Sequence, residues 1–295
     1  MGPRTPIYRL AADAEVMTRP AQTFYVLNET PCPYLPERRE RKLITELRGG
    51  DAAETFSQLS RAGFRRSHGF AYRPACHGCA ACVPVRVLAG RFRPSRSFQR
   101  ILRLNRDVRA FECPPQVSHE QFAVFDRYID ARHGDGEMAG MTFRDYRAMV
   151  EETRLDTCVA EFRSGDGQLI GACLADWLED GPSAVYSFFD PAFARQSPGT
   201  YMILWLIEEA RRRDLPHVYL GYWIASSRKM AYKARFQPVE GLGRDGWRPL
   251  PAINGATADG AAAERAPITD VLGRERPAAR AAIRTAPANR PAPTP

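Results

Sequence analysis

A long helix set between strand-like segments limits the folds that are open to this chain. Ser197–Arg213, SPGTYMILWLIEEARRR, begins with serine and proline, carries acids in its middle and ends in arginines, as capping and the helix dipole favour. Apolar segments of strand length lie on both sides of it, at Ala184–Asp190 and His217–Trp223. This alternation predicts an α/β protein built on a mixed sheet.

The remaining periodic segments extend this pattern after residue 113. The expected helices are Ser118–His133, Thr142–Glu152, Ser197–Arg213 and Lys229–Phe236. The expected strands are Asp156–Phe162, Leu169–Leu178, Ala184–Asp190, His217–Trp223 and residues 238–242. The first of these helices opens with a Ser-x-x-Gln capping box, which fixes its start at Ser118.

The first part of the chain reads as a separate α+β segment. Strands are expected at Phe24–Leu27, Phe64–Arg73 and Val83–Leu88, and helices at Pro36–Leu47, Ala52–Ala62 and Ser97–Val108, the last with Ser97 as N-cap. Two prolines in Cys113–Gln116 interrupt any regular element. We therefore expect a cysteine-bearing domain at 1–113, a second domain at 114–250 and a disordered tail rich in Ala, Pro and Arg at 251–295.

The charge of the chain favours a polyanionic partner. The 295 residues carry a net charge of +8, and only Lys42, Lys229 and Lys233 of the 42 basic residues are lysines. Arginine pairs bidentately with phosphate. The helix at Ser97–Val108 places Phe98, Ile101, Leu102, Leu104 and Val108 on one broad face and Arg96, Arg100, Arg103 and Arg106 on the other. The arginine face is either a track for nucleic-acid phosphates or an ordinary solvated surface.

A membrane location is not expected. The longest apolar run, Tyr201–Ile207, is too short to cross a bilayer, and the first residues, MGPRTPIYRL, lack the apolar core of a signal peptide. The cytoplasm is therefore the expected compartment. Thiols stay reduced there, which weakens a disulfide interpretation of the seven cysteines.

Three of the cysteines form a Cys-x2-Cys-x2-Cys pattern at Cys76, Cys79 and Cys82. A bacterial ferredoxin motif would continue with a fourth cysteine, but Arg86 stands at that position. A tetrahedral metal site needs a fourth ligand. His77 could serve, although it would compete with its neighbours, and the alternative is a set of small buried thiols.

The order of elements resembles the GNAT acyltransferase fold, in which an acyl carrier docks where the sheet opens. The signature of that fold before the long helix is (Gln/Arg)-x-x-Gly-x-(Gly/Ala); here Gln196 and Gly199 match, and Tyr201 replaces the last small residue. The resemblance and the free amides of a helix start assign an anion or an ester oxygen to this turn. The residues assigned to the acyl donor are Ser197, Gly199, Thr200 and Tyr201. Tyr201 argues against coenzyme A and for another carrier.

Five longer segments, in order, identify the family that the chain resembles. They are FYVLNETPCPYLPERRERKL, YRPACHGCAACVPVRV, FRPSRSFQRILRLNRD, YSFFDPAFARQSPGTY and GYWIASSRKMAYKARFQP. This set, from about residue 22 to 245, resembles the bacterial aspartate/glutamate leucyltransferases, relatives of eukaryotic arginyl-tRNA–protein transferases. The resemblance implies transfer of leucine from leucyl-tRNA to a protein N-terminal Asp or Glu, which marks the protein for degradation.

The implied chemistry makes few demands on the protein. An aminoacyl ester is already activated, and a protein α-amine has a pKa of about 7.7–8.0, so positioning supplies most of the acceleration and no cofactor is required. Arginine instead of leucine as the transferred residue stays open. The rival interpretations are a coenzyme A-dependent acetyltransferase and a non-enzymatic, metal-containing tRNA-binding protein.

Further site residues follow from the matching segments. Lys229 and Lys233 are candidates for phosphate or ester contacts, together with Arg100 and Arg103, or else belong to a solvated basic helix. Asp190 could orient or deprotonate the incoming amine, or could be a turn residue before Pro191. The cations assigned to the acidic side chain of the acceptor are Arg73 and Arg86.

The resemblance also supplies a fourth metal ligand. The eukaryotic relatives take cysteine ligands from two segments that match ETPCPYLP and the Cys-x2-Cys-x2-Cys run. Cys32 would therefore complete a zinc or iron–sulfur site with Cys76, Cys79 and Cys82. Those relatives have a Cys-x2-Cys pair in the first segment, whereas Leu35 occupies the second position here.

Overall fold

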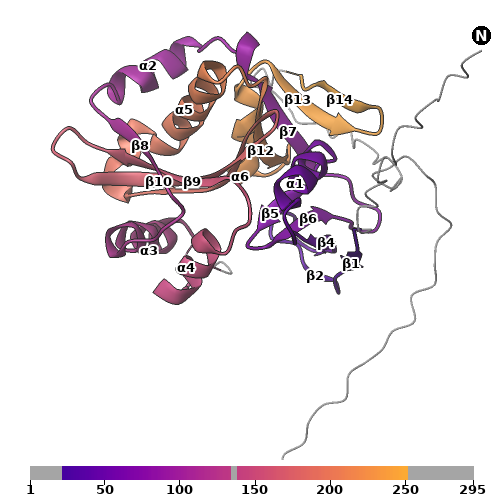
Figure 1. Ribbon diagram of the computed structural model, residues 1–295. Coiled ribbons are helices and arrows are strands. Elements are labelled where there is room, and N and C mark those ends of the chain that lie inside the picture. The colour runs from indigo at the N-terminus through magenta and orange to yellow at the C-terminus, as the bar shows by residue number, and fades with distance from the viewer. Residues whose placement is uncertain (1–21, 134–137, 252–295) are drawn as a thin grey trace, which may run out of the picture.

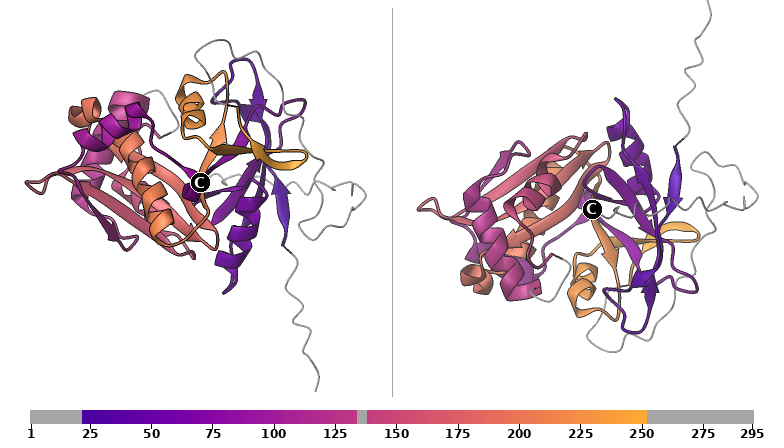
Figure 2. Two further views of the ribbon diagram at one scale, coloured as in Figure 1. Left: turned by 90° about the horizontal axis from the view of Figure 1, so that it is seen from above. Right: turned by 90° about the horizontal axis from the view of Figure 1, so that it is seen from below.

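The computed structural model describes residues 22–133 and 138–251 (Figure 1). The tail predicted at 251–295 lies, apart from Pro251, outside the described residues. The described part forms one large sheet with helices on both faces and a smaller sheet at one side (Figures 1 and 2). This confirms the mixed α/β class, with a small α+β region that contains the Cys76–Cys82 run.

Eight strands form the large sheet, in the order β14-β13-β7-β12-β11-β10-β9-β8. They are β14 (Gly246–Pro249), β13 (Val239–Gly243), β7 (Val83–Leu88), β12 (His217–Trp223), β11 (Gly181–Phe189), β10 (Leu169–Leu178), β9 (Thr157–Arg163) and β8 (Arg109–Cys113). All neighbours are antiparallel except β11 and β12, which are joined by α5 and run parallel. All ten residues of the central strand β10 are buried, because helices cover both of its faces.

The helices divide between the two faces of this sheet. α5 (Pro198–Arg212) and α2 (Arg96–Leu104) pack on one face, and α3 (His119–His133) and α4 (Phe143–Glu151) pack on the other (Figure 1). The core under α5 includes Met202, Leu206 and Ala210, none of which is exposed. The core under α3 centres on Phe125 and Tyr146.

A four-stranded sheet, in the order β1-β4-β6-β5, lies beside the large one (Figure 2). Its strands are β1 (Phe24–Val26), β4 (Lys42–Glu46), β6 (Phe70–Pro74) and β5 (Arg65–Ser67), and α1 (Ala52–Arg61) joins β4 to β5. A short pair, β2 (Thr30–Pro31) with β3 (Arg39–Glu40), precedes β4. Phe56 and Leu59 of α1 pack against Leu178 and Tyr219, so the two sheets share a core.

The large sheet contains strands from both sides of residue 113, where we expected a domain boundary. β7 pairs with β12 and β13 in the middle of the sheet, and β8 forms its edge beside β9. The prolines of Cys113–Gln116 follow the end of β8 directly. The sheet thus runs across that position, and the 1–113 and 114–250 division remains a prediction.

Several local predictions were wrong. The helix expected at Pro36–Leu47 is instead β3 and β4, because β4 pairs with β1 and β6 on its two sides and Ile44 and Thr45 suit a strand. The strand expected at Phe64–Arg73 is a hairpin, with a turn at His68 and Gly69 between β5 and β6.

The basic helix also differs from its prediction. α2 is capped by the hydroxyl of Ser95, which accepts from the amide of Phe98, rather than by Ser97, and the helix ends at Leu104. Phe98 is buried, but Leu102 and Leu104 are 37% and 46% exposed. The apolar face is therefore narrower than expected, because the helix lies on the sheet through its first half.

The order of elements after residue 113 is confirmed. Ser118 and Gln121 form the predicted capping box of α3, with hydrogen bonds of 3.1 and 3.2 Å. The helix expected at Lys229–Phe236 consists of α6 (Arg228–Ala231) and a 3-10 turn, η3 (Tyr232–Arg235). The prediction missed the edge strands β8 and β14, which are short and have exposed residues.

Candidate functional site

The large sheet opens between its two parallel strands. The register of β11 and β12 contains a single pair of partners, Ser183 and Tyr219. Both strands are irregular just beyond it: Val185 is skipped where β11 pairs with β10, and the pairing of β12 with β7 shifts between Tyr219 and Gly221. Strand irregularities of this kind turn backbone groups away from the ladder and are common next to active sites.

Arg65 of β5 enters this opening. Its Nη2 donates to the carbonyl oxygens of Ala184 and Val185, at 2.8 Å each, so the guanidinium occupies hydrogen-bonding groups that β12 leaves unpaired. Gly221 has a φ of +72°, and a Cβ at this position would overlap Nη1 of Arg65. Only glycine combines this backbone conformation with room for the arginine.

Lys233 of η3 lies buried beside the opening, with 8% exposure. Its Nζ donates to the carbonyl of Tyr222 at 2.7 Å and lies 3.3 Å from Sδ of Met230. Burial, and secondly the charge of Arg65, lower the pKa of Lys233 to about 7, while Cys82 acts in the opposite direction. The alternative interpretation, a solvated basic helix, therefore does not hold for Lys233, whereas Lys229 is exposed.

Arg65 acts electrostatically on three tyrosines, Tyr34, Tyr222 and Tyr232. The hydroxyl of Tyr222 donates to the carbonyls of Gly63 and Tyr72, at 3.1 Å each, which ties β12 to the small sheet. Burial raises the pKa of Tyr34 to about 12, and Tyr72, Arg65 and Cys82 also act on it. Tyr232 is 38% exposed.

Asp190, the predicted catalytic residue, follows β11 directly and is 7% exposed. Its Oδ1 accepts from the amide of Ala192 at 3.0 Å, and its Oδ2 accepts from Nη2 of Arg127 at 2.6 Å. Both oxygens are therefore engaged, one by the turn at Pro191 and one by α3. This arrangement suits an ion pair that holds α3 against the end of β11 better than a free base.

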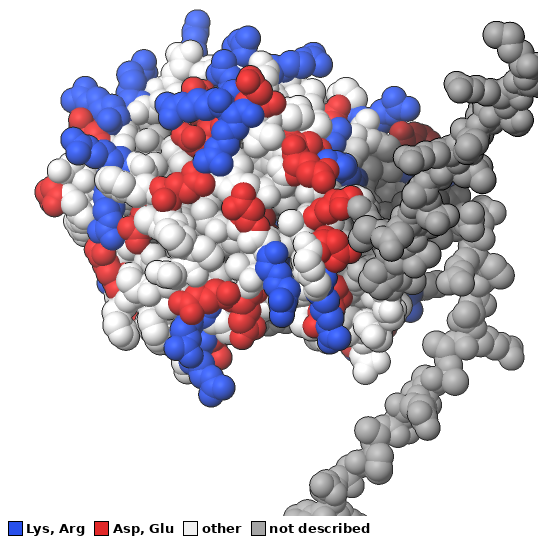
Figure 3. Space-filling model, in the orientation of Figure 1, with Lys and Arg blue, Asp and Glu red and all other residues white. Residues whose placement is uncertain are grey.

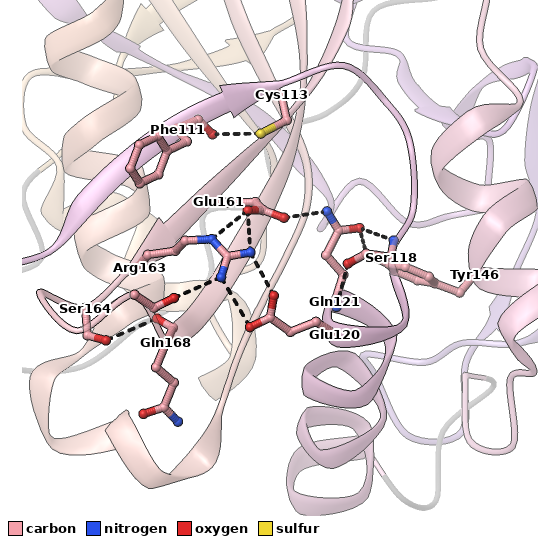
Figure 4. A network of polar contacts seen from close by, with 11 residues as sticks. Phe111, Cys113, Ser118, Glu120, Gln121, Tyr146, Glu161, Arg163, Ser164 and Gln168 are labelled. Carbon is pink, nitrogen blue, oxygen red and sulfur yellow. Dashed lines mark hydrogen bonds and ion pairs between the residues drawn. The ribbon is translucent and has the colours of Figure 1, made fainter.

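A second polar network anchors the start of α3 (Figure 4). Arg163 of β9 lies between Glu120 of α3 and Glu161 of β9, with Nη2 2.8 Å from a carboxylate oxygen of each. Gln121 donates to Glu161 at 2.8 Å. Because Arg127 and Tyr128 lie further along the same helix, these contacts fix the side chains that α3 presents near β11.

The start of α5 offers one of the predicted backbone amides, that of Gly199, because Pro198 has no N–H and the amide of Ser197 donates to the carbonyl of Ala194. Ser197 is the N-cap residue and Pro198 follows at N1, as predicted, but Ser197 has a left-handed φ of 55° and its side chain accepts from no backbone amide. Its carbonyl accepts from the amides of Thr200 and Tyr201 at 3.1 Å each. Gly199 lies against the ring of Phe189. The ring of Tyr201 packs edge-on against Phe162, 5.8 Å between centroids, in the core beneath α5.

The arginines of α2 and of the turn that follows it form an exposed row. Arg96, Arg100, Arg103 and Arg106 are all exposed, and basic side chains gather over this helix at the top of Figure 3. Arg235 of η3 joins the row to the opening, because its guanidinium lies over the ring of Phe98 and reaches Ser97 Oγ at 3.4 Å. Arg100 and Arg103 are therefore placed where a polyanion could run toward η3.

The two arginines predicted for the acceptor carboxylate have other contacts. Arg86 forms an ion pair of 2.9 Å with Glu240 and stacks on Trp247. Arg73 donates to the carbonyl of Ala62 at 3.1 Å. Both Arg73 and Arg65 act electrostatically on the buried hydroxyl of Tyr222. Arg73 thus lies near the opening, while the charge of Arg86 is compensated by an acid.

The four predicted metal ligands are half-buried free thiols. In residues 22–133 and 138–251, no group of three or more His, Cys, Asp or Glu side chains is placed to hold a metal ion. The thiol of Cys76 accepts from the amide of Arg41 at 3.4 Å and donates to its carbonyl at 3.7 Å. As placed here, Cys32, Cys76, Cys79 and Cys82 do not fit a closed tetrahedral site, and metal binding by them remains a prediction.

Sequence reasoning missed Arg65. It lies in FRRSHGF, outside the five segments that carry the family resemblance, and next to Arg66, which is buried in the core. Nothing in the linear string distinguishes the two. The glycine of HVYLGYW was an available signal, because an isolated glycine in a strand often marks a bulge or a close approach of another group.

No helix within the described ranges is both long and apolar enough to cross a membrane.

Residues 30–100 match the family described as arginine-tRNA-protein transferase, N terminus. Residues 120–243 match the family described as arginine-tRNA-protein transferase, C terminus. A crystal structure of the C-terminal domain of a putative lysylphosphatidylglycerol synthetase from Agrobacterium fabrum aligns with a TM-score of 0.40 and 14% identity, over 66% of this chain and 71% of that chain.

Two relatives extend over nearly their whole length. The aspartate/glutamate leucyltransferase of Paramagnetospirillum magneticum is 55% identical over 233 residues, which are 79% of this chain and 96% of that protein. The aspartate/glutamate leucyltransferase of Granulibacter bethesdensis is 53% identical over 238 residues, 81% of this chain and 89% of that protein. The chain therefore belongs to the aspartate/glutamate leucyltransferase family of aminoacyltransferases.

Proposed function

We propose that this protein transfers leucine from leucyl-tRNA to the N-terminal Asp or Glu of acceptor proteins and so creates a signal for their degradation. The observation that carries the proposal is the opening between β11 and β12, with the buried Lys233 beside it and the start of α5 next to the end of β11. Such an opening can hold an activated ester and an amine side by side. The row of α2 arginines supplies a surface for the tRNA phosphates.

The transfer requires the acceptor α-amine to attack the ester carbonyl, with loss of a proton from the amine and departure of the tRNA ribose oxygen. The α-amine is partly neutral near pH 7.5, so the protein acts chiefly by holding the two reactants together. The amide of Gly199, at the start of α5, has no backbone acceptor among the described residues and is suited to an ester oxygen that becomes negatively charged. The donor places the reaction in the cytoplasm, where aminoacyl-tRNAs are made.

Mass spectrometry of peptides after incubation with charged tRNA tests the proposal. Asp- and Glu-initiated peptides should gain one leucine from leucyl-tRNA and nothing from arginyl-tRNA. A gain of arginine would keep the reaction and change the donor. If neither tRNA modifies the peptides, the proposal is wrong, and acetyl-coenzyme A is the donor to try next, with the same peptides.

A further inference from the structure

The buried acids of the described residues each have a nearby cation. The pairs are Glu40 with Lys42 at 2.8 Å, Glu161 with Arg163 at 2.8 Å, Asp176 with Arg66 at 2.8 Å, and Asp190 with Arg127 at 2.6 Å. This is the usual arrangement, because a charge taken out of water is costly unless it is paired. Buried charge that follows this pattern needs no ligand to explain it.

Arg65 and Lys233 depart from this pattern. Neither forms an ion pair with any acid in residues 22–133 and 138–251. Their polar partners are the carbonyls of Ala184, Val185 and Tyr222. The charged groups that act on Lys233 are Arg65 and Cys82, so Arg65 repels the protonated form of Lys233, and no carboxylate of the described residues pairs with either side chain.

Arg65 also keeps unused donors. Nη2 makes both of its hydrogen bonds, whereas Nε and Nη1 make none with the part of the chain that the structure describes. Nη1 lies over Gly221 of β12, at the opening of the sheet. The two carbonyls of β11 thus fix the plane of the guanidinium. The donors on Nε and Nη1 are left to bind a planar anion.

We propose that Arg65 and Lys233 form a carboxylate site that receives the acidic side chain of the acceptor's N-terminal residue. The assignment rests on the proposed function, since the acceptor begins with Asp or Glu. A carboxylate placed between the two cations would compensate their repulsion and satisfy the free donors of Arg65. Its α-amine is only a few bonds away and would therefore be held at the opening between β11 and β12.

A carboxylate fits this place better than a phosphate of the tRNA. Lys233 is 8% exposed, so a short side chain can reach it more readily than a phosphodiester with a sugar on each side. The exposed arginines of α2 offer the tRNA a separate set of cations. The two substrates would then use different parts of the basic surface.

Transfer kinetics with paired peptides test the site. Two peptides that differ only in an N-terminal Asp or the isosteric, neutral Asn are compared at saturating leucyl-tRNA. Loss of a charge-assisted hydrogen bond corresponds to about 10- to 100-fold in affinity, so the native enzyme should prefer Asp by at least that factor, chiefly through KM. In Lys233→Met and in Arg65→Gln the preference should fall to within about threefold, with the Asn peptide little changed.

Control variants separate binding from folding. Lys233→Arg keeps the charge and should keep most of the preference for Asp, and Arg147→Gln, an exposed arginine of α4, should behave like the native enzyme. If Lys233→Met lowers the rate of transfer to the Asp and the Asn peptide by the same factor, Lys233 only stabilises the fold. An unchanged preference, or a weaker tRNA affinity with an unchanged peptide KM, would also contradict the site.

Calorimetry tests the same site without transfer and without a variant. At pH 8, Lys233 is mostly neutral, and an anion bound beside it should draw a proton from the buffer. The native protein should take up protons on binding the Asp peptide and none with the Asn peptide. Equal uptake for both peptides would overturn the proposal. If leucine transfer fails but this difference is seen, the proposed function is wrong and the site stands.

Discussion

Arg65 and Arg66 are neighbours in β5 and have opposite electrostatic surroundings. Arg66 is 1% exposed and pairs with Asp176 of β10 through two hydrogen bonds, of 2.8 and 2.9 Å, and Asp176 also accepts from Thr157 at 2.7 Å. Arg65 is half-buried and reaches carbonyl oxygens only. Successive side chains of a strand point to opposite faces, so Arg66 points into the core and Arg65 into the opening of the large sheet.

The comparison distinguishes a buried charge that is paired within the chain from buried cations that bind an anion from outside. The Arg66–Asp176 pair joins the small sheet to the large one and is complete within the chain. The pair of Arg65 and Lys233 is complete only with an anion from outside. Its repulsion is tolerated because the carbonyls of Ala184, Val185 and Tyr222 offset part of the charge.

Removing the acid of the complete pair should have the largest effect. Asp176→Asn leaves Arg66 charged in a fully buried position, which costs about 3–5 kcal/mol of the free energy of unfolding. Urea denaturation measures this loss. Where the variant still folds, the ratio of activity on Asp and Asn peptides should stay native, because the opening is untouched; a changed ratio would show that the two pairs are coupled.

Gly221→Ala should displace the side chain of Arg65 from its position against β12. The left-handed φ of +72° and the overlap of the new Cβ with Nη1 of Arg65 together cost about 2–4 kcal/mol. Gly90→Ala is the matched control, because an added Cβ at Gly90 would have no atom within 4 Å apart from its chain neighbours. This change should leave the free energy of unfolding almost unaltered. Combined with Arg65→Ala, the Gly221→Ala variant should lose less than the sum of the two single changes. Strict additivity in a double-mutant cycle would mean that the two residues do not meet.

The buried lysine predicts a pH dependence of stability. Lys233 has a pKa of about 7 in the folded protein, against 10.5 when unfolded, so the unfolded chain binds more protons between these values. Stability therefore rises with pH from about 7 toward 10.5, by at most about 1.4 kcal/mol per pH unit from this group. Subtraction of Lys233→Met unfolding curves, at several pH values, isolates the contribution. Identical slopes for both proteins would contradict a lysine that is neutral when folded.

The exposed arginines should show the smallest effect on stability. Arg100→Gln with Arg103→Gln should change the free energy of unfolding by no more than about 0.5 kcal/mol, because both side chains are exposed. The affinity for leucyl-tRNA should fall, and the slope of its logarithm against log salt should become shallower by about one unit per lost phosphate contact. If filter-binding or fluorescence assays give the native salt dependence for the double variant, the arginines of α2 do not bind the tRNA.

The sequence predicted what local pattern determines. The capping box at Ser118 and the long helix after Ser197 depend on neighbouring residues, and both helices are found. The helix predicted at Pro36–Leu47 is wrong because the partners that make β4 a strand, β1 and β6, are distant from it in sequence. Among the predicted site residues, Lys233 lies beside the opening, but its burial and its neighbour Arg65 depend on a contact between β5 and β11 that no linear spacing reveals.

The proposed carboxylate site requires the two substrates to bind different cations. One set of measurements tests it: the KM for an Asp-initiated peptide and the Kd for leucyl-tRNA, determined for Lys233→Met and for the Arg100→Gln, Arg103→Gln double variant. We predict that Lys233→Met raises the peptide KM by about 10-fold or more with a native Kd for tRNA, and that the double variant does the reverse. If both variants shift the same constant, the separation of the two sites is wrong.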